Sequence, residues 1–159
     1  MEPPPPVLDC AHVLEYAEVD ASVKYTGRIT VYVDRKELGP VPRLAICENM
    51  DKASEATLFL FYCDSEWNVL GAGGGASLAA VRENAEKAYA GISAKWVKSN
   101  YSREQAEVYL SESWGDMRCG FCGRTPNQVQ RLIEGKGGAK ICDICISELK
   151  EELNMEARP

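Results

Sequence analysis

The sequence predicts an α+β domain, in which a small antiparallel sheet is covered by one or two helices, followed by a smaller module near the C-terminus. Three observations support this fold class. Short runs of β-branched and aromatic residues, separated by turn residues, fill much of the first 70 positions. Two segments with helical periodicity and capping residues come next. Two closely spaced pairs of cysteines then follow residue 115.

Composition indicates the class of protein. The 159 residues are 45% hydrophobic and 26% charged, which suits one modest core and one small appended module. A run of about 18 apolar residues, which a membrane-spanning helix would need, does not occur. The first residues, MEPPPP, lack the basic and apolar regions of a secretory signal. We therefore expect a cytoplasmic protein whose seven cysteines serve as thiols and metal ligands rather than as disulfides.

Charge is divided unevenly along the chain. Residues 1–116 contain 11 Lys and Arg against 18 Asp and Glu, whereas residues 117–159 contain 7 against 6. Neither part has the excess of Lys and Arg with which nucleic-acid-binding proteins neutralise phosphates. The composition therefore makes nucleic acid an unfavoured partner.

The prolines at positions 3–6 predict the conformation of the N-terminal segment. A run of prolines favours an extended backbone without internal hydrogen bonds, so we expect residues 1–6 to form a solvated, disordered Pro-rich tail. The alternative interpretation is a proline-rich ligand motif.

Several strand-like stretches are expected in the domain that follows. Residues 22–34 alternate apolar and polar side chains, and residues 43–47 and 57–63 are apolar runs rich in β-branched and aromatic residues. Asp, Ser and Glu at positions 64–66 have turn chemistry, so the chain is expected to return as a hairpin into a short strand at residues 67–70.

A glycine-rich segment at residues 71–75 precedes the first predicted helix. We expect this segment to be a flexible loop, after which Ser77 is the N-cap of an amphipathic helix over residues 78–90. A phosphate-binding loop is the alternative, because exposed backbone N–H groups at a helix start attract anions. The segment, however, lacks the Lys-Ser/Thr ending of a P-loop and the G-x-G-x-x-G spacing.

A short strand and a second helix complete the predicted domain. Residues 93–98 are expected to form the strand. Ser102 and Gln105 make a capping box, which predicts a helix to about Ser111. We expect this α+β domain, of unknown role, to span residues 7–115.

Few residues of this domain point to catalysis. His12 is the single histidine of the chain, and Cys10 lies two positions before it, as in a Cys/His catalytic pair. A packing or surface role is the favoured interpretation of a lone histidine. Cys10, Cys47 and Cys63 lie among apolar neighbours, and we interpret them as small buried hydrophobic residues. No catalytic residue and no cofactor-binding residue is predicted.

Two cysteine pairs, Cys119-x2-Cys122 and Cys142-x2-Cys145, have the spacing of a structural zinc site. Each C-x2-C turn brings two sulfurs to one side of a tight knuckle, and the 19 residues between the pairs allow the second pair to return to the same ion. We therefore predict that these four cysteines bind one Zn2+. A redox role for the C-x-x-C pairs is the competing interpretation.

The elements around these cysteines predict a treble-clef-like C4 zinc finger. A Thr-Pro-x-Gln sequence at residues 125–128 has the form of a capping box with proline at the first helical position, so a helix is expected to run to Gly135. Residues 139–141 are expected to be a short strand. Cys142 and Cys145 would then enter the last helix, whose N-terminal dipole favours thiolate.

The C-terminal segment, residues 117–153, contains C-x-F-C-G, a polar turn, V-x-x-L-I before a glycine, I-C-D-x-C-I and an acidic amphipathic end. It resembles the N-terminal zinc-binding domain of ClpX, the unfoldase of the ClpXP protease. We interpret residues 116–155 as a ClpX-type C4 zinc finger, whereas the domain before it resembles no family that we recognise. In ClpX the finger forms a homodimer and captures adaptors or substrate segments, so the resemblance implies a bacterial protein with a dimerising, protein-binding finger.

The expected function is therefore a noncatalytic, zinc-binding protein-interaction module that binds a protein partner or a Clp-type substrate or adaptor. A module of about 40 residues cannot easily bury all of its apolar side chains. They are Phe121, Val129, Leu132, Ile133, Ile144, Ile146 and Leu149. We expect a homodimer formed around Phe121, Leu132 and Ile146, with packing against the N-terminal domain as the alternative.

Two other functions remain open at this stage. A nucleic-acid-binding zinc finger would use the basic residues of the module, which are Arg118, Arg124, Arg131, Lys136 and Lys140. An enzyme would place its site in the N-terminal domain near the glycine-rich segment, with Asp64, Glu66 and Trp67. That region offers carboxylates but no paired base and nucleophile.

Overall fold

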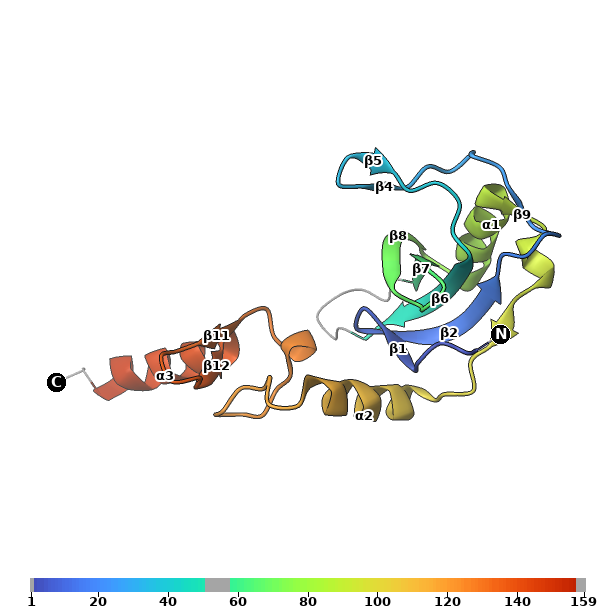
Figure 1. Cartoon of the computed structure of the whole chain (residues 1–159). Helices are drawn as coiled ribbons and strands as arrows, with labels where there is room; N and C mark the ends of the chain where they lie inside the picture. Colours follow the sequence, from blue (N-terminus) through green and yellow to red (C-terminus); the bar gives the residue numbers. More distant parts are fainter. Residues whose placement is uncertain (1, 51–57, 157–159) are drawn as a thin grey trace. The chain divides into compact units, whose positions relative to one another are not determined.

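The computed structural model describes residues 2–50 and 58–156 (Figure 1). The chain forms two compact units, Met1–Glu107 and Val108–Pro159, which we call unit 1 and unit 2. The division falls inside one helix, α2 (Arg103–Trp114). Among the described residues, no helix combines the length and the apolarity needed to cross a membrane.

Unit 1 is built on a curled antiparallel sheet (Figure 1). Its strands follow the order β1-β2-β6-β7-β8, and β10 also pairs with β2. In chain order they are β1 (Val7–Leu8), β2 (Ala11–Glu18), β6 (Arg43–Asn49), β7 (Leu58–Cys63), β8 (Val69–Gly75) and β10 (Val97–Lys98). The α+β class is confirmed, because the described residues combine this sheet with three α-helices.

Two separate apolar clusters bury the two faces of the sheet. Alternate residues of β6 and β7 supply them, with Leu44, Ile46, Leu60 and Tyr62 in one cluster and Ala45, Cys47, Phe61 and Cys63 in the other. Helix α1 (Leu78–Ala88) covers the first face and buries Val81, Ala85 and Ala88 there. Because both faces are buried, β6 and β7 read as continuous apolar runs rather than as alternating ones.

The predicted strands at residues 43–47 and 57–63 are confirmed as β6 and β7, although Thr57 lies outside the described residues. The hairpin from β7 into β8 is confirmed as well. Its turn is held by the Asp64 carboxylate, which accepts hydrogen bonds from the backbone N–H groups of Glu66 and Asn68 at 2.8 and 2.9 Å.

The glycine-rich segment 71–75 is a strand, so the expectation of a flexible loop is wrong. The segment forms most of β8 and pairs with β7. Its glycines make room for neighbours: a Cβ on Gly71 would lie 2.8 Å from Cγ1 of Val31, and one on Gly75 would lie 2.9 Å from Cγ2 of Val81. The predicted N-cap of the next helix is confirmed, because the Ser77 hydroxyl accepts a hydrogen bond from an N–H group of the first turn at 3.2 Å.

The expectation of a long strand at residues 22–34 is also wrong. Within it, only β3 (Lys24–Tyr25) and β4 (Tyr32–Val33) are strands, and they pair with β9 (Tyr89–Ala90) and β5 (Lys36–Glu37) respectively. The apolar side chains at positions 29 and 31 still pack against the first core cluster, but the one at position 33 is exposed. The alternation thus marks a segment that lies over the core without joining the main sheet.

The segment before α2 is less regular than expected. A 3-10 turn, η1 (Ile92–Ala94), replaces the first half of the strand predicted at residues 93–98, and only β10 is a strand. The capping box at the start of α2 is confirmed. The Ser102 N–H donates to the Gln105 side chain at 2.9 Å, and the Gln105 N–H donates to the Ser102 hydroxyl at 3.3 Å.

The sequence does not reveal β2, which lies beside β6 in the sheet, because a bulge hides its alternation. The register shifts between Val13 and Glu15, which leaves Leu14 as the extra residue. Val13 belongs to one core cluster and Ala17 to the other. The bulge therefore turns Glu15 toward α1, where its buried carboxylate accepts a hydrogen bond from Nε of Arg82 at 2.9 Å.

The proline-rich segment packs on unit 1, so the expectation of a solvated tail at residues 1–6 is wrong for the part that the structure describes. Pro4 and Pro6 are buried. The Pro6 carbonyl accepts a hydrogen bond from the Val13 N–H at 3.0 Å. Met1 lies outside the described residues.

A strained turn joins β1 to β2. Its two residues, Asp9 and Cys10, both have positive φ, at 45° and 61°. A side chain in this left-handed region costs about 1 kcal/mol, whereas glycine adopts it freely. We expect Cys10→Gly to be more stable to thermal unfolding than the matched variant Cys10→Ala by about 1 kcal/mol. Equal unfolding free energies for the two variants would contradict this account of the turn.

Unit 2 contains the end of α2, a short hairpin and the last helix. The hairpin joins β11 (Leu132–Glu134) to β12 (Lys140–Cys142), and α3 (Asp143–Glu156) follows it directly. The predicted strand at 139–141 and the helix that begins at the second cysteine pair are therefore confirmed.

The expectation of a helix from residue 125 to residue 135 is wrong. Only one turn of 3-10 helix, η2 (Pro126–Gln128), forms there, held by a hydrogen bond from the Thr125 N–H to the Gln128 side chain at 3.1 Å. Leu132 and Ile133, whose spacing from Val129 suggested a helix, lie on β11. The strand separates them: Leu132 packs against the cysteines, and Ile133 is exposed.

Candidate metal centre

The structure brings the four cysteines of the two C-x2-C pairs together. Their sulfur atoms all lie within 4.8 Å of one another. Sγ of Cys119 is 3.8 Å from Sγ of Cys145, and Sγ of Cys122 is 3.6 Å from Sγ of Cys142. Four sulfurs that bind one zinc at about 2.3 Å in a tetrahedron are about 3.8 Å apart. The cluster therefore fits a tetrahedral zinc ion.

The first cysteine pair lies on a tight turn. The Gly123 N–H donates to the Cys119 carbonyl at 2.9 Å, and the Cys119 N–H donates to the Arg124 carbonyl at 2.9 Å. Gly123 has φ of +73°, which a residue with a side chain adopts only with strain. This glycine therefore lets the backbone fold back over the sulfurs.

The second cysteine pair lies at the junction of β12 and α3. Cys142 ends the strand, and Cys145 is in the first turn of the helix. The Cys142 N–H points at Sγ of Cys119 at 3.3 Å, and the Cys145 N–H points at Sγ of Cys142 at 3.4 Å. The first contact links the two pairs, and both contacts place donors where thiolate charge would lie.

Asp143, which lies between Cys142 and Cys145, holds the backbone of residues 130–131 beside the cysteine cluster by hydrogen bonds. Its Oδ1 accepts hydrogen bonds from the N–H groups of Gln130 and Arg131 at 3.2 and 3.1 Å, and its own N–H donates to the Arg131 carbonyl at 3.1 Å. No role of Asp143 was predicted from the sequence. The carboxylate at the first position of a predicted helix was the available signal.

The pKa values of the cysteines respond to this arrangement. Burial alone would raise the pKa of Cys119, but N–H groups from Cys122, Cys142 and Phe121 outweigh it and lower that pKa to about 6. The backbone N–H and the guanidinium of Arg124 likewise lower the pKa of Cys122. Burial, followed by contacts with the other three sulfurs, raises the pKa of Cys145. A metal ion would favour deprotonation of all four thiols.

An apolar shell surrounds the sulfurs. Cys119, Cys142 and Cys145 are buried, and Cys122 is exposed. The partly buried side chains that pack against the cluster are Val129, Leu132, Ile141 and Ile144. Among residues 2–50 and 58–156, no other group of three or more His, Cys, Asp or Glu side chains has ligand atoms placed to hold an ion.

Comparison with known proteins agrees with this geometry. Residues 117–154 match the family model of the ClpX C4-type zinc finger. The resemblance of the C-terminal segment is therefore confirmed, and the match together with the cysteine cluster indicates zinc binding. No solved structure matches the chain significantly.

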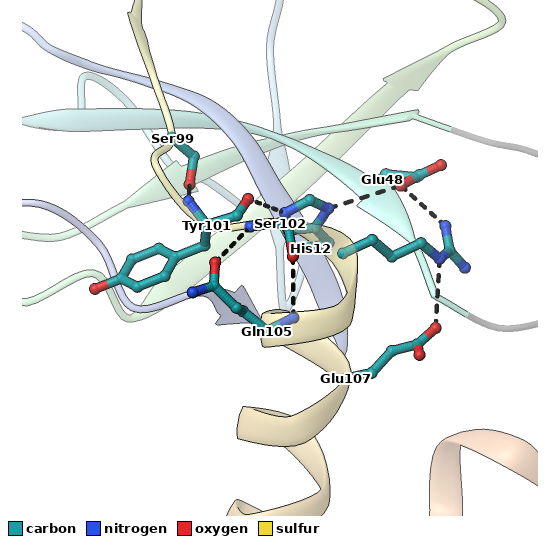
Figure 2. A network of polar contacts seen from close by, with 8 residues as sticks. His12, Glu48, Ser99, Tyr101, Ser102, Gln105 and Glu107 are labelled. Carbon is teal, nitrogen blue, oxygen red and sulfur yellow. Dashed lines mark hydrogen bonds and ion pairs between the residues drawn. The ribbon is translucent and has the colours of Figure 1, made fainter.

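The histidine of unit 1 is held by contacts within that unit (Figure 2). His12 is 6% exposed; its Nε2 is 2.9 Å from the Tyr101 carbonyl, and its Nδ1 is 3.7 Å from a Glu48 carboxylate oxygen. The same carboxylate accepts from Arg103 at 2.9 Å. Both ring nitrogens thus face groups of unit 1, which suits packing at the start of α2 better than catalysis.

The cysteines of unit 1 are Cys10, Cys47 and Cys63, and none of them belongs to the four-cysteine cluster. Cys47 and Cys63 are fully buried. Burial raises the pKa of Cys47 well above its ordinary value and that of Cys63 to about 12, so both stay protonated. Burial also raises the pKa of the half-buried Cys10. Cys47 and Cys63 pack as small hydrophobic side chains, as the sequence suggested, but the same expectation is wrong for Cys10, which is only half-buried.

Proposed function

We propose that this chain is a noncatalytic zinc-binding protein-interaction module. The observation that supports it best is the four-cysteine cluster, whose sulfur separations suit one Zn2+, within a segment that matches the ClpX-type finger. Zinc would be held by Cys119, Cys122, Cys142 and Cys145 in a treble-clef-like arrangement of knuckle, hairpin and helix. Its role would be structural, because all four tetrahedral positions are occupied by cysteine and none is left for substrate.

The second part of the proposal is that the finger forms a homodimer. Large apolar side chains are exposed on its knuckle, hairpin and helix, namely Phe121, Ile133, Leu149 and Leu153. Phe121 and Leu153 are 68% and 67% exposed. Exposed apolar side chains of this size on so small a unit favour an interaction surface. The partner that covers these side chains is a second copy of the finger, as the ClpX resemblance implies.

The structure changes the residues that should be tested. Leu132, which the sequence placed in the dimer contact, packs against the cysteine cluster, so a charge there would disturb the metal site itself. Ile146 and Ile144 are half-buried. Phe121 and Ile133 are the better probes, because their exposed side chains can be changed without opening the apolar shell of the cluster.

We expect Phe121→Asp to convert the dimer to a monomer while zinc remains bound. The added charge would have to be desolvated at the contact, and an interface of about 800 Å2 per partner would occupy most of one face of the finger. Sedimentation at about 50 µM, well above the dissociation constant of a micromolar dimer, provides the measurement. Tyr32→Asp is the matched control, because Tyr32 in unit 1 is equally exposed at 68%.

Two outcomes would contradict the homodimer. The wild-type protein could sediment as a monomer at that concentration, or Phe121→Asp and Tyr32→Asp could leave the dimer equally intact. Capture of a protein partner, or of a Clp-type substrate or adaptor, is tested with the same pair of variants. A partner of the finger should be lost with Phe121→Asp and retained with Tyr32→Asp.

A further inference from the structure

An open cleft of unit 1 lies beside the N-terminal proline segment and the side chain of Trp67. Its volume is about 500 Å3. Its lining includes Glu2 and the prolines at positions 3–5, and also Arg43, Trp67 and Tyr101. The zinc finger takes no part in this cleft, since all of its lining residues belong to unit 1.

Trp67 presents the chemistry that recognises an extended proline segment. Its indole N–H donates to the Glu2 carbonyl at 3.1 Å. The guanidinium of Arg43 lies over its ring, 4.9 Å from the centroid, and Tyr16 meets it edge-on at 5.7 Å. Proline-rich segments expose carbonyl groups and ring faces but no N–H groups, so aromatic side chains with an N–H or O–H donor bind them.

The backbone of Trp67, which positions this indole, is strained. Trp67 has φ of +67°, which is rare for a bulky residue. The Asp64 turn keeps it there: the Trp67 N–H donates to the Asp64 carbonyl at 3.3 Å, and the Asp64 carboxylate accepts from the Asn68 backbone and side chain. Strain of this kind persists where the surrounding structure fixes a side chain for a contact.

The segment itself is tied down by few hydrogen bonds. Prolines have no N–H, so four of the five residues from position 2 to position 6 cannot donate one. The bonds that hold the segment are accepted by the carbonyls of Glu2 and Pro6. Glu2 and Pro3 are exposed, whereas Pro4 and Pro6 are buried. A segment held in this way opens at low free energy compared with the sheet.

We propose that the surface of unit 1 around Trp67 is a proline-recognition site, which residues 2–6 cover in the same chain and which accepts a proline-rich segment of another polypeptide when they leave. The ligand class is a run of prolines after a residue whose backbone carbonyl accepts the indole N–H, as in Glu2 to Pro6. Because the internal segment is present at a millimolar effective concentration, an external segment competes only weakly until the internal one is displaced.

The test uses the full chain and the peptide acetyl-Glu-Pro-Pro-Pro-Pro-amide, with the indole N–H resonance of Trp67 as readout. Trp67→Phe assigns that resonance among the three tryptophans. Pro4→Asp places a charge at a buried proline and should displace the internal segment. We expect the peptide to restore the wild-type indole resonance in Pro4→Asp at a concentration roughly tenfold lower than that needed to perturb the wild type.

The experiment has a control variant and a control peptide. Pro40→Asp, at an exposed proline, should behave as wild type, and the peptide acetyl-Glu-Gly-Gly-Gly-Gly-amide should not bind. No response of Pro4→Asp to millimolar peptide, or an equal response to the glycine peptide, would overturn the proposal. If Pro4→Asp does not fold, hydrogen exchange of the wild-type Trp67 indole decides: exchange faster than the amides of β6 supports a detachable segment, and exchange only with global unfolding refutes it.

Discussion

Cys142→Ser is expected to abolish zinc binding and unfold the finger. Cys142 is fully buried, its sulfur lies 3.6 Å from that of Cys122, and its own N–H points at the sulfur of Cys119. Removing one ligand opens the tetrahedral site, and metal binding supplies about 10 kcal/mol or more of the folding free energy of such a finger. Metal analysis should find one zinc per wild-type chain and none in the variant. A 1:1 zinc content in Cys142→Ser would falsify the assignment of the ligands.

Cys63→Ala is the matched control for this experiment. Cys63 is equally buried, but it belongs to the core of unit 1 and not to the four-cysteine cluster, so zinc content should stay at one per chain. Amide exchange on the two proteins then shows how far the loss extends. We expect Cys142→Ser to lose protection in unit 2 only, because unit 1 has its own two core clusters. Loss of protection in β6 and β7 as well would show that the units fold together.

The second large effect is expected from Arg82→Met, which leaves the carboxylate of Glu15 buried without its partner. The side chain of Glu15 is 4% exposed, and the guanidinium of Arg82 binds both of its oxygens, with Nε at 2.9 Å. Removing one partner of a buried ion pair is strongly destabilising because the other charge stays desolvated. We expect a loss of about 3 kcal/mol in unfolding free energy, the low end of such losses, because Arg82 is partly exposed.

Chemical denaturation of two further variants tests this explanation. Lys87→Met breaks another ion pair of α1, with Glu83, in which both side chains are more than half exposed, and should cost about 0.5 kcal/mol or less. The double variant Glu15→Leu/Arg82→Met removes both buried charges and should recover most of the loss. Equal effects of Arg82→Met and Lys87→Met would contradict the role of the buried carboxylate.

Features whose cause lies within a few neighbouring residues could be predicted from the sequence. The spacing of the four cysteines was sufficient to place them as one cluster, because each C-x2-C turn and its glycine set the local geometry. The capping residues Ser77 and Ser102 located two helix starts, since a cap acts on the N–H groups of the next turn. The apolar runs of β6 and β7 were recognisable because both faces of these strands are buried.

The spacing of apolar residues was misleading where a short segment fits both a helix and a turn followed by a strand. Val129, Leu132 and Ile133 fit one face of a helix, yet the hairpin uses Leu132 for the cysteine shell and leaves Ile133 exposed. A spacing of three and four residues is too brief a pattern to separate a helix from a turn followed by a strand. The pairing of β11 with β12, in which Leu132 lies opposite Cys142, favours the strand.

Only the tertiary structure decided the features that depend on distant neighbours. The bulge at Leu14, which turns Glu15 toward Arg82, requires β6 as the reference strand. The glycines of β8 look like a loop until Val31 and Val81 are seen to fill the space where side chains would be. The N-terminal prolines look like a solvated tail until Trp67, more than 60 positions away, donates its N–H to Glu2. In each case the deciding contact joins residues far apart in sequence, so that local propensity and spacing contain no record of it.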